Sequence, residues 1–242
     1  MSANRAASRI ALDVQEVDSL YGELQVLRKA SLRLHEGEVV ALFGPNGHGK
    51  STLLKAVAGI HPAVSGSIQY RGVEISGTTS EKIVEMGIAY IPEDRNLFTE
   101  MTVLENLRLG AFNRKARGRV AENLEYVFVL FPRLDERKDQ IASTLSGGES
   151  RMLAIGRGLM SGASLLLIDE PSIGLSPITK KAVFGAIETI KQETDITVLI
   201  VEQEVDHALK LAERVYLLKK GRVVLEKEAA HISKAEIEKV YF

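Results

Sequence analysis

A glycine-rich loop that follows a short apolar run constrains this chain most strongly. The loop reads GPNGHGKST and comes directly after VVALF at residues 39–43. Its spacing fits G-x-x-x-x-G-K-[ST], in which glycines let successive backbone N–H groups approach a polyphosphate without an intervening Cβ. Residues 50–58 have a helical pattern that stops at Gly59, and the amino end of a helix attracts anions. The sequence therefore predicts a strand–loop–helix unit that binds a nucleotide.

Two side chains of this loop have separate predicted roles. We expect the Lys50 ammonium to bind the β- and γ-phosphates and the Ser51 hydroxyl to ligate Mg²⁺. The alternative is an ordinary glycine-rich turn, which would not require a strand before it and a helix after it. The predicted nucleotide-binding residues of the loop are Gly44, Pro45, Asn46, Gly47, His48, Gly49, Lys50, Ser51 and Thr52.

A pair of carboxylates ends a second apolar run, LLLIDE, at residues 165–170. Ligands bind at the carboxyl ends of the strands in open α/β sheets. We expect Asp169 to hold Mg²⁺, directly or through water, and Glu170 to act as the general base on an attacking water. The alternative is that these acids only mark where a strand reaches solvent. Together with the phosphate loop, they favour a nucleotide hydrolase.

The composition excludes several classes of protein. The chain has no cysteine, which excludes disulfides, thiolate catalysis and cysteine-bound metals and fits a reducing cytosol. Its net charge is −1, so we expect no nucleic-acid partner, because such binding needs a basic excess. The apolar runs fall far short of the roughly 20 residues that span a bilayer. The first nine residues are predicted to be a loose tail and not an export signal.

The order of segments predicts an α/β fold. Strands are expected at IALDVQEV, QVLRKASLRLHEGEVVALF, GIAYI, LLLID and ITVLIV, and hairpins at GSIQYRGVEI and RVYLLKKGRVVLE, whereas residues 102–161 have helical patterns. We expect one domain over residues 1–242, with a P-loop NTPase core, a mainly parallel sheet, an N-terminal antiparallel β region and an inserted α-helical subdomain. The expected boundaries are 1–92 and 163–242 for the catalytic core and 93–162 for the helical subdomain.

A third motif, LSGGE at residues 145–149, carries a family resemblance. In isolation, SGG would indicate a flexible connector before a helix. Its position between the phosphate loop and LLLIDE makes the chain resemble the ATP-binding cassette (ABC) family over nearly its whole length. The resemblance implies that two ATPase subunits close head to tail over two ATP molecules. Each ATP would be held by the phosphate loop of one subunit and by Ser146, Gly147, Gly148 and Glu149 of the other.

Four more positions follow from this resemblance. Tyr21 matches the aromatic residue that stacks on adenine, with a core strand position as the alternative. Glu93 and Gln203 stand where most members have a Mg²⁺-sensing glutamine and a γ-phosphate-contacting histidine. A carboxylate still ligates Mg²⁺, and an amide still donates to phosphate but takes up no proton near neutral pH. His207 lies one helical turn after Gln203 and is expected to be an ordinary helix residue.

With Glu93 and Gln203 at these two positions, the chain resembles one branch of the family. This branch is the smaller ATPase of branched-chain amino-acid uptake systems. That branch implies transmembrane permease subunits, a homodimer or a heterodimer with a sibling ATPase, and indirectly a solute-binding protein. It also implies a peripheral position on the cytoplasmic face of the membrane. A soluble ABC ATPase that remodels a scaffold, as in iron–sulfur cluster assembly, is the alternative. Repair or translation ATPases and G proteins fit less well, because long insertions and an Asn-Lys-x-Asp motif are missing.

Two further segments have two interpretations each. The basic run at residues 113–119 is expected to be a solvated helix face, with contact to anionic lipid as the alternative. An apolar segment after Glu93 is predicted to pack mainly in the core, and the resemblance also implies a groove there for a short helix of a membrane subunit. The apolar residues concerned are Leu97, Phe98, Met101, Val103, Leu104 and Leu107.

Overall fold

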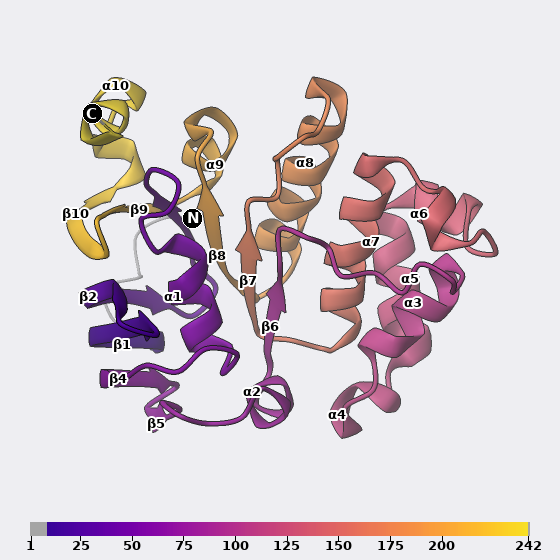
Figure 1. Ribbon diagram of the computed structural model, residues 1–242. Coiled ribbons are helices and arrows are strands. Elements are labelled where there is room, and N and C mark those ends of the chain that lie inside the picture. Colours follow the sequence, from indigo (N-terminus) through magenta and orange to yellow (C-terminus); the bar gives the residue numbers. More distant parts are fainter. Residues whose placement is uncertain (1–8, 242) are drawn as a thin grey trace.

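Two β-sheets form the centre of the fold in the computed structural model, which describes residues 9–241 (Figure 1). Residues 1–8 of the predicted tail lie outside the described residues. The four-stranded sheet comprises β1 (Ile10–Tyr21), β2 (Leu24–His35), β4 (Ser65–Tyr70) and β5 (Val73–Glu74) in the order β2-β1-β4-β5. The six-stranded sheet comprises β3 (Val39–Phe43), β6 (Ile88–Ile91), β7 (Leu165–Asp169), β8 (Thr197–Glu202), β9 (Arg214–Lys219) and β10 (Arg222–Glu228) in the order β10-β9-β3-β8-β7-β6.

Strand pairing confirms the predicted sheet types. β1 pairs antiparallel with β2 and β4, whereas β3, β6, β7, β8 and β9 are parallel neighbours, with β10 antiparallel at one edge. All five residues of β3 are buried, because both faces of the central sheet are covered. Val39, Ala41 and Phe43 belong to one core cluster and Val40 and Leu42 to the other. This burial explains why β3, β7 and β8 read as continuous apolar runs.

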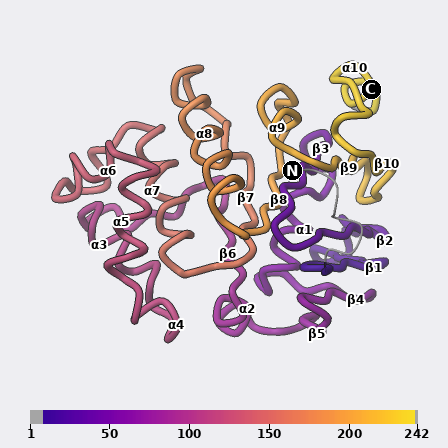
Figure 2. The backbone as a smooth tube through the Cα atoms, turned by 180° about the vertical axis from the view of Figure 1, so that it is seen from behind, coloured from indigo at the N-terminus to yellow at the C-terminus, as the bar shows by residue number. Residues whose placement is uncertain are grey.

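Helices cover the six-stranded sheet on both faces. α1 (Lys50–Val57) packs between the two sheets, and its helical turns end one residue earlier than the sequence predicts. α8 (Pro177–Glu193) and α9 (Val205–Leu211) cover the opposite face, as Figure 2 shows from behind. α2 (Ser80–Met86) precedes β6 and has the predicted bounds. The sequence patterns did not predict α10 (Lys234–Tyr241) at the end of the chain.

Helices also make up the segment between β6 and β7. This group and the antiparallel sheet lie at opposite ends of the molecule (Figures 1 and 2). Gly156 allows close packing within the group, because a Cβ there would lie 2.9 Å from Val127 and 3.1 Å from Leu107. The group consists of α3 (Val103–Gly110), α4 (Arg114–Arg117), α5 (Val120–Leu130), α6 (Pro132–Glu136), a 3-10 turn (Ala142–Thr144) and α7 (Gly147–Met160).

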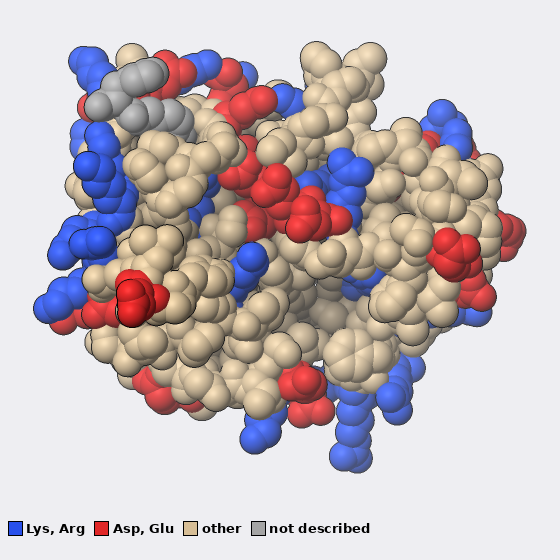
Figure 3. Space-filling model, viewed as in Figure 1, with Lys and Arg blue, Asp and Glu red and all other residues tan. Residues whose placement is uncertain are grey.

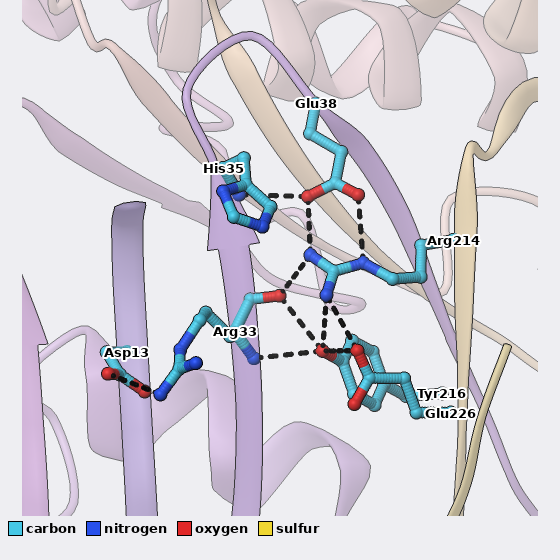
Figure 4. A network of polar contacts seen from close by, with 7 residues as sticks. All are labelled: Asp13, Arg33, His35, Glu38, Arg214, Tyr216 and Glu226. Carbon is cyan, nitrogen blue, oxygen red and sulfur yellow. Dashed lines mark hydrogen bonds and ion pairs between the residues drawn. The ribbon is translucent and has the colours of Figure 1, made fainter. Parts of the chain in front are cut away.

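A buried polar network joins the two sheets (Figure 4). Arg214 of β9 donates to both carboxylate oxygens of Glu38, at 2.9 and 2.7 Å, and to the backbone oxygen of Arg33 in β2 at 2.7 Å. The Tyr216 hydroxyl accepts from the backbone nitrogen of Arg33 at 3.1 Å. These charge-assisted bonds fix β2, and with it the antiparallel sheet, against the larger sheet. Within the described residues, no helix combines the length and apolarity needed to span a bilayer.

Candidate nucleotide site

The phosphate loop connects β3 to α1, and its glycines are required by close contacts. A Cβ on Gly44 would lie 2.2 Å from the backbone oxygen of Leu218. Gly49 caps α1 with a φ of 103°, and a Cβ there would lie 2.9 Å from the Leu27 side chain. Gly44 therefore excludes a side chain for packing reasons, and Gly49 also does so for conformational reasons. The loop thus passes close to β9 and β2 while its backbone opens toward the carboxyl ends of the parallel strands.

The Lys50 side chain is almost fully buried beneath the loop. Its Nζ donates to the backbone oxygen of Pro45 at 3.3 Å and lies 3.3 Å from Oε1 of Glu170. The cation is therefore held between the loop and the carboxylate at the end of β7. Because little water reaches it, an anion in the loop would interact with it more strongly than with a surface lysine.

Asp169 is buried at the end of β7 and accepts two hydrogen bonds from side chains. Ser51 donates to Oδ1 at 3.0 Å, and the Tyr90 hydroxyl donates to Oδ2 at 3.0 Å. Burial raises the pKa of Asp169, the neighbouring Glu170 charge raises it further, and the two hydrogen bonds oppose the rise. Tyr90 belongs to β6 and carries no motif, so sequence reasoning did not find it.

Glu170 has a left-handed backbone, with a φ of 45°, in the turn after β7. Its N–H donates to the Val201 oxygen at 2.9 Å, which holds this unfavourable conformation against the neighbouring strand. The Gln203 side chain, just after β8, donates to Oε2 of Glu170. Three predicted catalytic residues, Lys50, Glu170 and Gln203, therefore meet through direct contacts.

These groups line a cavity of about 370 Å³. Its lining comprises Val26, Asn46, Gly47, Gly49, Lys50, Ser51, Thr52, Glu93, Glu170, Ile173 and Gln203. Burial raises the pKa of Glu93, and the negative charges of Glu170 and Asp169 raise it further. Figure 3 shows acidic side chains gathered in the middle of this face, above the carboxyl ends of β7 and β8. The cavity thus combines backbone donors and one buried cation with oxygen groups that favour an added cation.

Comparison with known proteins places this geometry in a family. Residues 27–173 match the family model described as ABC transporter. This chain belongs to the ABC transporter family. Its α/β fold, phosphate loop and strand-end carboxylates are those of an ABC ATPase domain, which binds nucleotide. The resemblance inferred from the three sequence motifs is therefore confirmed.

Two curated relatives cover nearly the whole chain. It is 46% identical over 219 residues to the high-affinity branched-chain amino acid transport ATP-binding protein BraG of Pseudomonas aeruginosa, covering 90% of this chain and 93% of BraG. It is 35% identical over 216 residues to a probable branched-chain amino acid transport ATP-binding protein LivF of Archaeoglobus fulgidus, covering 89% and 91%.

Solved structures agree with the fold. An ABC transporter cassette in its ADP conformation has a TM-score of 0.81 at 26% identity, covering 96% of this chain and 94% of that one. A dimeric cassette bound to ADP and Pi in a post-hydrolysis state has a TM-score of 0.76 at 26% identity, covering 90% and 98%.

The signature motif of this ABC ATPase lies apart from its own phosphate loop. Ser146 caps α7, accepting from the Glu149 N–H at 3.3 Å, while the Glu149 carboxylate accepts from the Ser146 N–H at 2.9 Å. Arg137 forms an ion pair with Glu149 at 2.9 Å. A Cβ on Gly148 would lie 2.3 Å from Thr179, so α7 starts in close contact with α8. None of residues 146–149 lines the nucleotide cavity, so the single chain does not unite the two motifs.

Tyr21 also lies outside the lining of the cavity. It ends β1, is 45% exposed and stacks on His61, with ring centroids 3.9 Å apart and an interplanar angle of 12°. The alternative of a buried core aromatic is therefore wrong. An exposed ring whose one face rests on an imidazole offers its other face for stacking.

Sequence reasoning missed Arg151, although it stands two residues after the signature motif. The side chain is fully buried in α7 and donates to the backbone oxygens of Pro92 at 2.9 Å and Glu93 at 2.8 Å. It therefore ties the signature helix to the loop that carries Glu93. The only signal in the sequence was an arginine near the start of a helix with few acidic neighbours. This pattern does not specifically predict a buried arginine.

Gln203 and His207 have different surroundings in the structure, and the effect of this difference on turnover can be measured. Gln203 touches Glu170, whereas His207 stacks on Phe184 with ring centroids 5.0 Å apart. We expect Gln203→Ala to lower ATP turnover by about tenfold, because it removes a donor that orients the base. His207→Ala should lower turnover much less. Parallel steady-state ATPase assays of the two variants check this. A larger loss of turnover in His207→Ala than in Gln203→Ala would reject the alignment of Gln203 with the γ-phosphate-contacting histidine of most members.

Proposed function

We propose that this chain is the ATP-binding and ATP-hydrolysing subunit of an importer for branched-chain amino acids or related small polar solutes. The single observation that carries the proposal is the 46% identity to BraG over 90% of the chain. The nucleotide cavity is consistent with it. The subunit would act at the cytoplasmic face of the membrane, bound to permease subunits. ATP-driven closure of two such subunits would move the permeases between two access states.

Hydrolysis would use the three side chains that meet in the cavity. A water attacks the γ-phosphorus while Glu170 accepts its proton as general base, and the bond from the γ-phosphorus to the β–γ bridging oxygen breaks, so that ADP is the leaving group. Lys50 offsets the charge that develops on the phosphate oxygens. Gln203 would orient the Glu170 carboxylate and donate to the γ-phosphate, and it would not itself take up a proton.

The residues present fit a magnesium ion. Hydroxyl and carboxylate oxygens are the ligands that Mg²⁺ prefers, and Ser51 and Asp169 already lie in hydrogen-bond contact. Burial raises the pKa of both Asp169 and Glu93, so a cation bound beside them would stabilise their negative charges. We propose that Ser51 and Asp169 hold the ion and that Glu93 is a further ligand. When bound, Mg²⁺ would supply positive charge next to the phosphate oxygens.

A second subunit would complete the site. The signature residues 146–149 start the 14-residue helix α7, whose first N–H groups include those of Gly147 and Gly148. They would donate to the γ-phosphate held by the partner, which is either an identical chain or a sibling ATPase. Tyr21 would stack on the adenine. After hydrolysis the γ-phosphate no longer bridges the two subunits. The fraction of closed dimer then declines, because the contact that favoured the closed over the open state is lost.

An apolar groove supports docking to a membrane subunit. It has a volume of about 380 Å³ and runs from β6 along α3 and α7, with Phe98, Leu109 and Phe112 in its lining. Val103 and Leu107 are instead buried in the core, as expected for most of this segment. We propose that the groove accepts a short helix of a permease, and that residues 93–162 act as a helical subdomain beside a core of residues 1–92 and 163–242.

A complementation experiment tests this function. The chain is expressed in a Pseudomonas aeruginosa strain that lacks BraG, and uptake of radiolabelled leucine is measured. We expect uptake to return with the unaltered chain and not with Lys50→Ala, at matched amounts in the membrane fraction. A chain that hydrolyses ATP yet stays in the soluble fraction and restores no uptake would reject the importer function. That result would favour the scaffold-remodelling ATPase, which the transport relatives at present disfavour.

A further inference from the structure

A second cleft, of about 620 Å³, lies on the other side of the phosphate loop, between β2 and the β9–β10 turn. Four basic side chains line it. Arg28 comes from β2, Lys219 ends β9, Lys220 lies in the turn, and Arg222 starts β10. The sequence spreads these residues over two distant segments, and the backbone contact of β2 with the β9–β10 turn brings them to one place.

The four cations have no acidic partners within residues 9–241. Their side chains form no hydrogen bond or ion pair with any residue of the described part of the chain, and the lining contains no carboxylate. Figure 3 shows basic side chains gathered along the left edge of the molecule, over β2 and β10. Like charges that share one space repel each other, so an anion placed among them would be attracted by all four.

The turn that carries these cations is fixed in position. The Gly221 N–H donates to the His48 oxygen at 3.1 Å, and the Arg28 N–H donates to the Gly221 oxygen at 2.8 Å. A Cβ on Gly221, whose φ is 78°, would lie 2.1 Å from the Val26 oxygen. The basic turn is therefore locked between β2 and the phosphate loop. A backbone fixed in advance in this way reduces the entropy that is lost when a ligand binds.

His48 adds a polar ring to the same cleft. Its Nδ1 atom is buried and has no hydrogen-bond partner among the described residues. Burial lowers the pKa of His48, and the positive charges of Lys50, Lys219 and Lys220 lower it further. The His48 ring thus lies in a positive potential, and a bound anion would offset this potential.

We propose that this cleft binds a phosphate-bearing anion in addition to the nucleotide, through Arg28, Lys219, Lys220 and Arg222. Guanidinium groups match phosphate oxygens in paired hydrogen bonds, and four cations suit a ligand with two or more negative charges. The cleft shares only Val26 and Gly47 with the lining of the nucleotide cavity, so the four cations stand outside that cavity. The anion is either a free phosphorylated compound or the headgroup of an anionic lipid.

The test measures binding of inorganic pyrophosphate to the full chain by titration calorimetry while saturating Mg-ADP fills the nucleotide cavity. We expect one pyrophosphate site, and at least about tenfold weaker binding in Lys220→Ala/Arg222→Ala, since two charge-assisted hydrogen bonds to the anion are lost. Arg114→Ala/Lys115→Ala on α4 is the matched control, because it removes the same two residue types from an exposed helix. This control should bind pyrophosphate as the unaltered chain does.

A second arm identifies the source of the phosphate. Sedimentation with phosphatidylglycerol vesicles, compared with phosphatidylcholine vesicles, is measured for the same three proteins. Loss of vesicle binding only in Lys220→Ala/Arg222→Ala, with no pyrophosphate binding, would assign a lipid headgroup; pyrophosphate binding without vesicle binding would assign a free compound. The proposal is overturned if neither probe binds, if Mg-ADP abolishes pyrophosphate binding, or if both variants lose binding equally. Failure of Mg-ADP itself to bind would count against the proposed function instead.

Discussion

Replacing Glu170 with glutamine is expected to reduce ATP turnover by about 10²- to 10⁴-fold while leaving ATP binding nearly unchanged. The amide keeps the shape of the side chain but cannot accept the proton of the attacking water. Lys50 and the phosphate-loop backbone, which would hold the phosphates, are unaltered. ATP would then remain intact between two subunits, so the closed dimer should accumulate. Phosphate-release assays, binding of a fluorescent ATP analogue and light scattering measure the three effects.

Glu204→Gln is the matched control for this experiment. Glu204 is also a glutamate just after a strand of the central sheet, but it is exposed and paired with Lys180. Loss of such a surface pair changes stability by less than about 1 kcal/mol. Its turnover should therefore stay close to that of the unaltered chain. If Glu170→Gln retained full turnover, the base would have to be sought elsewhere, and a variant that stayed monomeric with ATP would contradict the two-subunit mechanism.

Replacing Arg151 with methionine is expected to lower the free energy of unfolding by about 2–4 kcal/mol, because the two hydrogen bonds from its buried guanidinium group to backbone oxygens are lost. These acceptors are the oxygens of Pro92 and Glu93, which bind the two terminal nitrogens of the guanidinium group. Methionine fills a similar volume, so the loss of packing is small. Part of the cost is offset because a buried charge is also removed.

Urea unfolding monitored by circular dichroism measures this change. Arg108→Met on α3 is the control, since Arg108 is exposed and its replacement should change stability by no more than about 0.5 kcal/mol. Arg151→Met should also raise the Mg²⁺ concentration needed for half-maximal ATPase activity, because the loop that carries Glu93 loses its attachment to α7. A stability loss equal to that of the control would show that the two carbonyl contacts do not hold this loop.

Local sequence patterns determined much of the site. The glycines, Lys50 and Ser51 lie within a few residues of each other, so their spacing can be read directly from the sequence. The apolar run before them and the helical pattern after them indicate a loop between a strand and a helix. The same holds for Asp169 and Glu170 after LLLID, where continuous apolar burial sets the strand and its end. The hairpin of β9 and β10 and the helix α2 followed from turn glycines and from helical spacing in the same way.

Contacts between distant segments were decided only by the tertiary structure. Tyr90 reaches Asp169 because β6 pairs with β7, although 79 positions separate the two residues in sequence. Arg151 reaches Glu93 from 58 positions away because α7 packs beside the end of β6. Neither residue belongs to a pattern that nearby letters could reveal. The basic cleft likewise exists only because the Lys220 turn is locked against β2.

The sequence by itself therefore determined which chemical groups this ABC ATPase carries and on which kinds of element they stand. The tertiary structure decided which of them meet: Lys50, Glu170 and Gln203 share one cavity, while Ser146 starts a helix outside it. The physical reason is that loop and helix geometry depends on neighbours within a few residues. Strand order and helix packing instead depend on burial of apolar faces from the whole chain.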